Sequence, residues 1–332
     1  MNNTYLEEYP KITYDYDKIK LKKIFENPEV ANYPNEGIQT KSSKKVFGEI
    51  RFPEFPDDRS YTMASFVTSI DGKVAYLDRP QGPIVAKSNA LDPDGAEADF
   101  WVLNLMRANA DAVFVGAGTM QKEPDGLICI FDKDLEEARV KNGLSPTPWA
   151  VICSLDGTDI PFKDSLIDNQ PVIFNTSPIG FEVIKEKLNK DYYVVGPFAP
   201  KDQLDLSKIK SEFEENKHKR IPVIVTGEKN QTDSHIVLKI LKAMGFDKAM
   251  VESPSYCHAL LGDGLLDEMT LNYSCVYIGG AAVGLGDNMT PYTSEEHPHS
   301  EMLSIHSHSP SFFYFRHKFV YGKKPEFEEE EV

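Results

Sequence analysis

Ser69-Ile70-Asp71-Gly72-Lys73 (SIDGK) follows directly on Tyr61–Thr68 (YTMASFVT), a run rich in strand-forming residues. The run predicts a strand, and Gly72 permits the positive φ that a tight turn after it requires. Asp71 and Lys73 would then stand at the end of a strand, where short loops on a rigid scaffold commonly build sites. Because X-Asp-Gly-X is also a common turn with solvated side chains, the rest of the chain must decide between the two interpretations.

Beyond this turn, segments typical of strands alternate with segments typical of helices. Asp92-Pro93 predicts the N-cap and first residue of a helix. The alternation predicts a three-layer α/β/α fold with a mostly parallel central sheet, and the closely spaced strands at 269–273 and 312–321 predict an antiparallel C-terminal edge. Further strands are expected at 110–115, 148–153, 171–175, 192–196, 221–226 and 247–251, and helices at 181–188, 206–216, 234–244 and from the 252–255 segment to Gly264.

Two segments flank the predicted domain of residues 59–322. Residues 1–58 form an N-terminal extension that we expect to pack across the domain or a partner. Within it, residues 18–27 predict a short helix. The apolar positions of this helix would be Ile19, Leu21, Ile24 and Phe25. Residues 323–332 form an acidic tail that is expected to be disordered.

The composition excludes several classes of function. A net charge of −16 over 332 residues argues against nucleic acids and anionic membranes as partners, because nothing compensates phosphate repulsion. No run reaches the ~18 apolar residues of a membrane span, and the first residues lack a signal-peptide pattern, so we expect a cytoplasmic protein. The widely spaced cysteines predict free thiols. They are Cys129, Cys153, Cys257 and Cys275.

Small residues follow the predicted strand at 110–115, in the order Gly116-x-Gly118-Thr119. The dinucleotide fingerprint of the Rossmann fold would need a third glycine where Gln121 stands. Glycines after a strand can still admit a phosphate or a nicotinamide close to backbone N–H groups. The segment is therefore a candidate cofactor contact without being the standard fingerprint.

Two further junctions between a strand and a helix are candidate anion sites. Glu252-Ser-Pro-Ser255 and Thr226-Gly227 each lie where unpaired N–H groups and the helix dipole meet. An ordinary capped helix start explains each of them equally well when it is taken alone.

The late histidines raise the question of a metal site. His297, His299, His306, His308 and His317 could line one strand face. No cysteine or carboxylate stands at a convincing ligand spacing, so a polar loop or an edge strand is the preferred interpretation. The sequence also lacks the Gly-x-Ser-x-Gly, His-Glu-x-x-His and Gly-Lys-Ser/Thr motifs of hydrolases, zinc enzymes and NTPases.

The order of the motifs resembles one known family. SIDGK at 69–73 is followed by LMRANADAVFVGAGT at 105–119, Val251-Glu252 before a short helix, GLLDE at 264–268 and Gly279-Gly280. Over roughly residues 60 to 322 this order is similar to the reductase domain of riboflavin biosynthesis, the RibD C-terminal domain. That family shares the dihydrofolate reductase-like fold.

The resemblance implies an NADPH-dependent reductase, with NADH as an alternative coenzyme, and a homodimer. In this family hydride reduces the ribose of a pyrimidine ribotide, and the protein mainly orients donor and acceptor. The implied substrate is therefore a small pyrimidine-like molecule or another carbonyl or imine. Dihydrofolate itself is less expected, because the motif order matches the riboflavin branch better.

The resemblance also assigns roles to residues. Val67 and Thr68 would lie near the nicotinamide, while Ser69, Asp71 and Lys73 would face the substrate. Asp71, Lys73 or water would supply the proton. The residues implied to contact the cofactor are Gly116, Gly118, Thr119, Thr226, Gly227, Glu252, Ser253, Pro254, Ser255 and Tyr256.

Three departures from the family pattern bear on the site. The family usually has Gly-Gly-Pro after the glutamate, often with a cis Gly-Gly peptide, whereas this chain has Ser253-Pro254-Ser255. Because a cis bond before proline costs much less than one before other residues, we predict a cis Ser253–Pro254 bond. Two arginines that the family uses for the substrate phosphate are missing from residues 97–101 and 123–130. Losing both argues against a phosphorylated substrate.

Two other classes of function stay open. A degenerate family member could keep the fold and bind a nucleotide without reducing anything, which the missing arginines and Ser253-Pro254 favour. A metal-dependent enzyme using the late histidines is the weaker third alternative.

Overall fold

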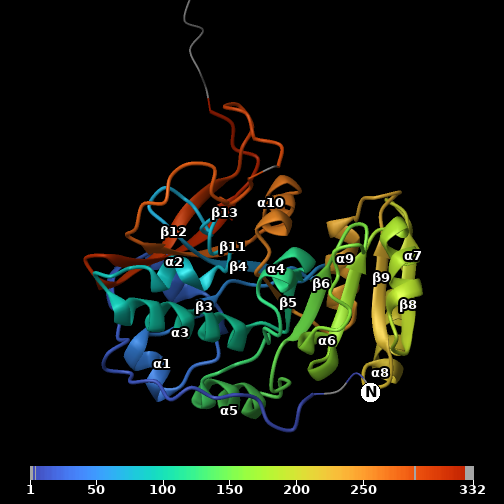
Figure 1. Ribbon diagram of the computed structural model, residues 1–332, viewed down its shortest axis with the longest axis horizontal. Coiled ribbons are helices and arrows are strands. Elements are labelled where there is room, and N and C mark those ends of the chain that lie inside the picture. Colours follow the sequence, from blue (N-terminus) through green and yellow to red (C-terminus); the bar gives the residue numbers. More distant parts are fainter. Residues whose placement is uncertain (1–2, 4, 288, 326–332) are drawn as a thin grey trace, which may run out of the picture.

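An eleven-stranded sheet organises the computed structural model, which describes residue 3, residues 5–287 and residues 289–325 (Figure 1). The strands lie in the order β1-β12-β13-β11-β4-β10-β5-β6-β7-β9-β8. Their bounds are β1 Lys22–Glu26, β4 Tyr61–Thr68, β5 Ala112–Gly116, β6 Trp149–Cys153, β7 Val172–Thr176, β8 Tyr192–Phe198, β9 Ile221–Thr226, β10 Lys248–Val251, β11 Glu268–Ser274, β12 His299–Ser309 and β13 Phe312–Val320. The acidic segment 326–332, expected to be disordered, lies outside the described residues.

The sheet is mostly parallel, with an antiparallel edge, which confirms the predicted fold class. From β11 to β8 every neighbouring pair is parallel. β13, β12 and β1 then add antiparallel strands at one edge. For the histidine-rich segment that forms β12, the sequence left a polar loop or an edge strand open; the structure shows a strand that lies next to the edge strand β1. A separate two-stranded sheet pairs β2 (Asn35–Glu36) with β3 (Arg51–Phe52).

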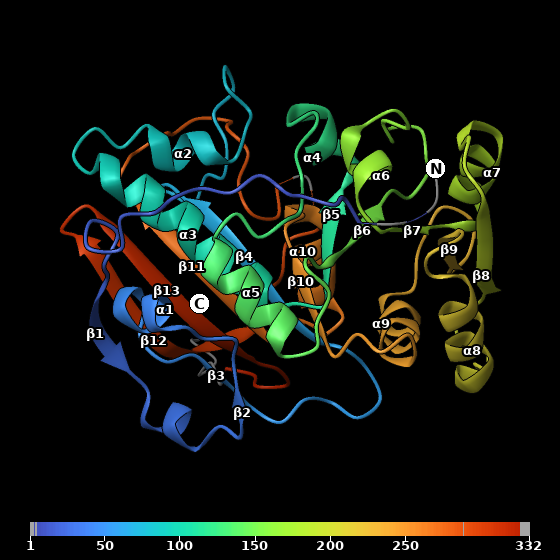
Figure 2. The ribbon, with the colours of Figure 1, turned by 90° about the horizontal axis from the view of Figure 1, so that it is seen from below.

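Helices cover both faces of the sheet and enclose two hydrophobic cores (Figure 2). One face carries α1 (Lys41–Val46), α3 (Pro93–Asn109), α5 (Lys133–Lys141), α6 (Ser165–Asn169) and α7 (Pro178–Lys187). The other face carries α8 (Leu206–Asn216), α9 (Ser234–Ala243) and α10 (Pro254–Gly262). Short helices complete the chain at η1 (Pro28–Asn32), α2 (Pro83–Lys87) and α4 (Ala117–Lys122). Among the described helices, none is long and apolar enough to cross a membrane.

The long helix α3 forms where its local signals place it. The Asp92 side chain caps the helix by accepting a hydrogen bond from the Gly95 N–H at 2.9 Å, and Pro93 occupies the first turn. Trp101 and Leu105 are fully buried against the sheet. This helix is also joined to β11, because Asp99 accepts a hydrogen bond from Asn272 Nδ2 at 2.7 Å.

The predicted helix at 18–27 is wrong, because residues 22–26 form the strand β1. β1 pairs antiparallel with β12 at the edge of the sheet. Ile24 and Phe25 remain 54% and 41% exposed, so the apolar spacing does not mark a buried helical face. The open N–H and C=O groups of an edge strand offer a backbone partner that a short, weakly apolar helix cannot match.

The N-terminal extension crosses the whole molecule (Figure 2). Near its start, the Asn3 side chain donates to the Lys217 carbonyl and accepts from the Val172 N–H. Further along the extension, the Lys18 carbonyl contacts the His308 ring at 2.6 Å, just before β1 joins the sheet. The extension therefore holds together elements from both ends of the sheet.

His306 of β12 is buried beneath this extension. Its ring stacks on Phe47 with the centroids 4.2 Å apart, and neither ring nitrogen has a hydrogen-bond partner among the described atoms. Burial lowers the pKa of His306 to about 4, and the charge of Lys23 acts in the same direction. The unfolded chain takes up this proton near pH 6.5, so the stability from a neutral His306 is present above that pH and is lost toward pH 4.

We predict that His306→Phe flattens the acid part of the stability profile. The wild type should lose about 3 kcal/mol through this group between pH 7 and pH 4, whereas the phenylalanine ring keeps the stack and has no proton to take up. Urea unfolding of both proteins over this range measures the difference. His218→Gln, a change at an exposed histidine, serves as the control. Parallel profiles for wild type and His306→Phe would contradict the prediction.

Candidate active site

Three adjacent parallel strands bring the main predicted segments together. β10 lies between β4 and β5, so the loops after these strands open at the same edge of the sheet (Figure 1). The loops are Ser69–Lys73 after β4, Glu252–Ser255 after β10 and Gly116–Thr119 after β5. In open α/β sheets such a point, where neighbouring strands lead away in different directions, is the usual place for a ligand.

The turn after β4 is fixed by hydrogen bonds of its own. Gly72 has a φ of +75°, the Ser69 N–H donates to the Lys73 carbonyl at 2.9 Å, and the Lys73 N–H donates to Ser69 Oγ at 2.9 Å. The sequence prediction of a strand ending in a tight turn is confirmed. The turn points its charged residues toward the loop that follows β11.

Asp71 is an anchor for that loop. Its carboxylate accepts hydrogen bonds from Ser69 Oγ at 2.6 Å, the Ile278 N–H at 3.1 Å and the Gly279 N–H at 2.7 Å. The bond from Ser69, followed by those from the two amides, lowers the pKa of Asp71 to about 2. A carboxylate so firmly ionised is a poor proton donor, so the geometry speaks against the catalytic role considered for Asp71.

The side chain of Lys73 lies close to the mouth of the site. Its side chain is 19% exposed, and Nζ lies 4.0 Å from Asp287 Oδ2, too far for a tight ion pair. Its backbone forms an isolated β-bridge with Gly284. The ammonium is therefore held beside the loop and is available to a ligand.

The start of α10 offers backbone N–H groups to an anion. Ser253 is the N-cap, but its side chain makes no capping hydrogen bond, and Pro254 is the first helical residue. The N–H groups of the first turn are thus free of a side-chain cap. Opposite them, a Cβ on Gly116 would meet Ser253 Oγ at 3.0 Å, while a Cβ on Gly118 would meet only open space.

The predicted cis bond before Pro254 is wrong. Among the described residues, the structure has its cis peptide bond at Gly196–Pro197 instead. Ser253 has φ −111° and ψ 112°, the extended backbone that a residue before proline prefers. Proline in the first turn already has the φ that a helix start requires, so a trans bond leads from β10 into α10 without a special turn.

A buried ion pair joins α3 to this junction. Arg107 Nε and Nη2 each donate to an oxygen of Glu252 at 2.7 Å, and Arg107 is 6% exposed. Burial would lower the pKa of Arg107. The negative charge of Glu252 outweighs this effect, so the pKa of Arg107 is raised. Both residues stand in the segments that carry the family resemblance, yet no local pattern indicated that they pair.

Asp99 carries a carboxyl between α3 and β11 that sequence reasoning did not single out. It lies on α3, where its Oδ1 accepts a hydrogen bond from Asn272 Nδ2 of β11 at 2.7 Å. Burial raises the pKa of Asp99 to about 7, against a smaller opposite effect of the Asn272 bond. One signal was available, because Asp99 shares a helical face with the apolar Val102 and Met106.

Three of the predicted cofactor contacts lie elsewhere. The Tyr256 ring packs in the core against Phe114, with the centroids 4.7 Å apart. Thr226 is buried at the end of β9, separated from β5 by β6 and β7, and accepts from the Asp233 N–H at 3.0 Å. A Cβ on Gly227 would meet the Gln231 carbonyl oxygen at 2.2 Å, so Gly227 serves the turn of its own loop.

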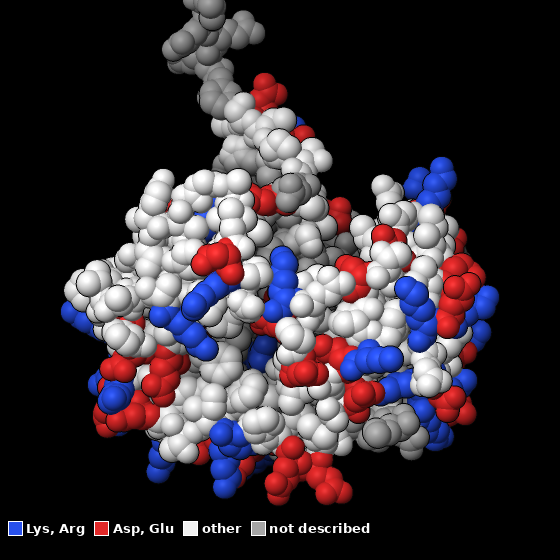
Figure 3. All heavy atoms as spheres, viewed as in Figure 1, with Lys and Arg blue, Asp and Glu red and all other residues white. Residues whose placement is uncertain are grey.

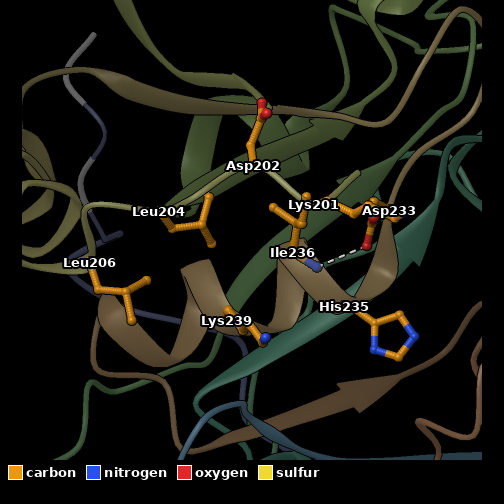
Figure 4. Close-up of a pocket in the computed structure, with 8 residues that line it drawn as sticks. All are labelled: Lys201, Asp202, Leu204, Leu206, Asp233, His235, Ile236 and Lys239. Atoms are coloured by element: carbon orange, nitrogen blue, oxygen red, sulfur yellow. Dashed lines mark hydrogen bonds between the residues drawn. The ribbon is translucent and has the colours of Figure 1, made fainter. Parts of the chain in front are cut away.

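Two hollows lie beside this distant loop. One, of about 330 Å³, lies at the start of α9, where Asp233 already caps the Ile236 N–H (Figure 4). Gly227 lines a second one of about 220 Å³. Because the cap satisfies the helix start, the anion site considered at Thr226-Gly227 receives no support from this geometry.

The late histidines are engaged separately. His306 stacks on Phe47, His308 contacts Asp92 at 2.8 Å, and His317 contacts Ser300 at 3.2 Å. Within the described parts of the chain, no three His, Cys, Asp or Glu residues stand close enough to hold a metal. On the face shown in Figure 3, basic and acidic side chains lie interspersed.

Comparisons with known proteins place this geometry in context. Residues 60–293 match the RibD C-terminal domain family. The chain is 24% identical over 223 residues to the 2,5-diamino-6-ribosylamino-4(3H)-pyrimidinone 5′-phosphate reductase of Archaeoglobus fulgidus, covering 67% of this chain and 83% of that protein.

Two solved structures share the fold. A pyrimidine reductase-like protein of Corynebacterium diphtheriae superposes with a TM-score of 0.53 at 18% identity, covering 84% of this chain and 99% of that one. Acinetobacter baumannii RibD superposes with a TM-score of 0.50 at 15% identity, covering 80% of this chain and 59% of that one.

We predict that Arg107→Met destabilises the protein by about 3–5 kcal/mol, because it leaves the Glu252 carboxylate, whose side chain is only 13% exposed, without a partner. Urea unfolding at pH 7 measures the loss. Lys44→Met is the matched control: it removes the exposed Lys44–Glu49 pair at 2.9 Å and should cost less than about 1 kcal/mol. The double change Arg107→Met with Glu252→Met should recover part of the stability. Equal, small losses for Arg107→Met and the control would show that the pair is not a structural constraint.

Proposed function

The chain belongs to the RibD C-terminal domain family, and on this premise we propose that it is a nicotinamide-dependent reductase of a small pyrimidine-bearing carbonyl or imine. The observation that carries the proposal is the meeting of the loops after β4, β10 and β5 at one edge of the sheet, beside the start of α10. This edge offers backbone N–H groups, small residues and a lysine within one site.

The residues present fit a dinucleotide. The first turn of α10 has no side-chain cap, Gly116 packs directly against Ser253, and Gly118 borders open space. At the end of β4, Thr68 Oγ1 is buried with no partner among the described atoms. When bound, the coenzyme supplies a hydride. We propose NADPH, which the family resemblance implies, with NADH as the alternative.

The substrate side of the site is proposed to lie around Lys73. Asp71 holds the 278–279 backbone in place, while the Lys73 ammonium stays free to contact a substrate oxygen. The A. fulgidus relative is a 5′-phosphate reductase by name. In this chain residues 97–101 and 123–130 contain no arginine, and Glu123 accepts instead from the Gly82 N–H at 2.8 Å. We therefore propose that a phosphorylated pyrimidine ribosylamine is a poor substrate and that its dephosphorylated form is better.

Fluorescence titration with NADPH and NADH tests the cofactor, and turnover of the two ribosylaminopyrimidinones tests the substrate. We expect NADPH to bind and the dephosphorylated compound to be reduced faster. Robust turnover of the phosphorylated compound would refute the substrate preference. Failure to bind either coenzyme would favour the degenerate family member.

We predict that Lys73→Ala lowers kcat/KM by about 10- to 100-fold, the range for losing a hydrogen bond from a charged group. The Kd for NADPH should stay within about threefold of wild type, because Lys73 is placed on the substrate side. Lys87→Ala, which removes an exposed lysine from α2, is the control and should leave both values unchanged. Equal losses of coenzyme affinity and substrate use in Lys73→Ala would place Lys73 on the wrong side of the site.

A further inference from the structure

Two histidines of β12 contact the N-terminal extension in different ways. His306 is a neutral ring that stacks on Phe47 of the extension. His308, two residues later, lies between the extension and the start of α3, with its side chain 11% exposed. The extension and β12 both lie outside the family match at residues 60–293, so the family resemblance assigns no function to these contacts.

Both ring nitrogens of His308 face hydrogen-bond acceptors. Nε2 lies 2.6 Å from the Lys18 carbonyl oxygen, and Nδ1 lies 2.8 Å from Asp92 Oδ2. A neutral imidazole carries only one N–H, so it can donate to only one of these acceptors, and the other contact would set two lone pairs against each other. An imidazolium donates to both. The complete contact therefore requires a charged ring.

Other donors hold Asp92 as an ionised acceptor. The Gly95 N–H donates to Oδ1 at 2.9 Å, and the Ser309 hydroxyl donates to Oδ2. Because hydrogen bonds of this kind favour the carboxylate, the proton at the contact with His308 belongs on the ring. Neither donor is part of the extension, so the cap of α3 stays in place when the extension moves.

The charges around His308 favour its protonated form. The negative charges that act on the ring are Asp92 and Asp94, at the start of α3. Burial opposes protonation, but the hydrogen bond to the Lys18 carbonyl and the two carboxylates outweigh it. Together they raise the pKa of His308 above its usual value of about 6.5.

The positive charges near this contact belong to the extension. β1 places Lys22 and Lys23 opposite residues 307 and 306 of β12. Asp17, which precedes the bonded carbonyl, pairs with Lys45 at 2.7 Å. On the other side of β12, β13 has uncharged phenylalanines opposite residues 307 and 309. The carboxylates at the start of α3, rather than these lysines, therefore set the charge of the ring.

We propose that His308 is a pH-operated clasp on the N-terminal extension: its imidazolium ties Lys18 to Asp92, and loss of the ring proton breaks one of the two bonds and loosens residues 18–26 from the edge of the sheet. The clasp contributes fully below about pH 6.5, where the free histidine is also protonated, and is lost as the pH rises through the raised value of the folded state. His306 responds in the opposite direction, because its stack needs the neutral ring.

The segment that follows the clasp is held lightly. All five side chains of β1 are exposed, and within residues 18–26 only Ile19 and Leu21 are buried. Losing a hydrogen bond from a charged group should therefore make this segment open about 10- to 100-fold more often, while the two buried side chains keep it from detaching altogether. Each opening of β1 exposes the backbone of β12 as a free sheet edge.

The charge of the ring can be measured without coenzyme or substrate. In protein labelled with ¹⁵N in the histidine rings, one ring should titrate above the usual value of about 6.5 and should disappear from the spectrum in His308→Gln. If the ring of His308 titrates at or below that value, the contact does not hold an imidazolium and the proposal fails. This result stands whether or not the proposed reaction is found.

Hydrogen exchange, corrected for its intrinsic dependence on pH, tests the loosening. Protection of residues 18–26 in the wild type should fall by about 10- to 100-fold as the pH rises through the titration of His308, whereas α3 at residues 93–109 should keep its protection. In His308→Gln the protection of residues 18–26 should be low throughout and should not change with pH. Wild-type protection that stays constant through the titration of His308 would overturn the proposal.

A second variant covers the case in which His308→Gln does not fold. Asp92→Asn keeps a good N-cap for α3 but removes a charge that stabilises the imidazolium, so the fall in protection should move to lower pH than in the wild type. His306→Phe, on the same strand, is the matched control and should leave this fall where it is. A fall at the same pH in Asp92→Asn and in the wild type would show that the contact with Asp92 does not operate the clasp.

Discussion

The bidentate pair between Arg107 and Glu252 is the constraint on which the rest of the site depends. Its two ends belong to elements far apart in sequence, the last turn of α3 and the junction of β10 with α10. Separating the pair would leave a charge in a poorly solvated place, so the two elements keep a fixed distance. Through this one contact, α3 on one face of the sheet is tied to the start of α10 on the other.

The features that were predicted correctly from the sequence are those fixed by residues close together in the chain. The turn after β4, the Asp92-Pro93 start of α3 and the helix expected at 234–244 each depend on neighbouring residues, and each lies where expected. β1 was mistaken for a helix because its conformation comes from pairing with β12, more than 270 residues away. β12 itself is polar, and its partner strands, rather than its own pattern, hold it in the sheet. Long-range backbone pairing leaves little trace in a short window of sequence.

The candidate site shows the same contrast between local signals, which the sequence reveals, and long-range contacts, which it does not. The order of motifs predicted that the loops after β4, β5 and β10 would contribute to one place, and the topology brings these loops together. What individual side chains do there was harder to foresee. Asp71 is occupied by amides of a loop more than 200 residues later, and Tyr256 turns into the core. In the sequence, Asp99 only marked a segment without arginine, because its contact with Asn272 joins α3 to a strand about 170 residues later.

The long path of the N-terminal extension has a consequence for synthesis. Lys18 and β1 are made early, but their partners, His308 and β12, leave the ribosome some 290 residues later. β10 must likewise enter between β4 and β5 after both have been made. The nascent chain therefore has to keep an open sheet edge and an undocked leading segment through most of translation, a state in which unpaired strands are prone to wrong partners. Residues 18–26 must therefore wait for partners that are made about 280 to 290 residues later.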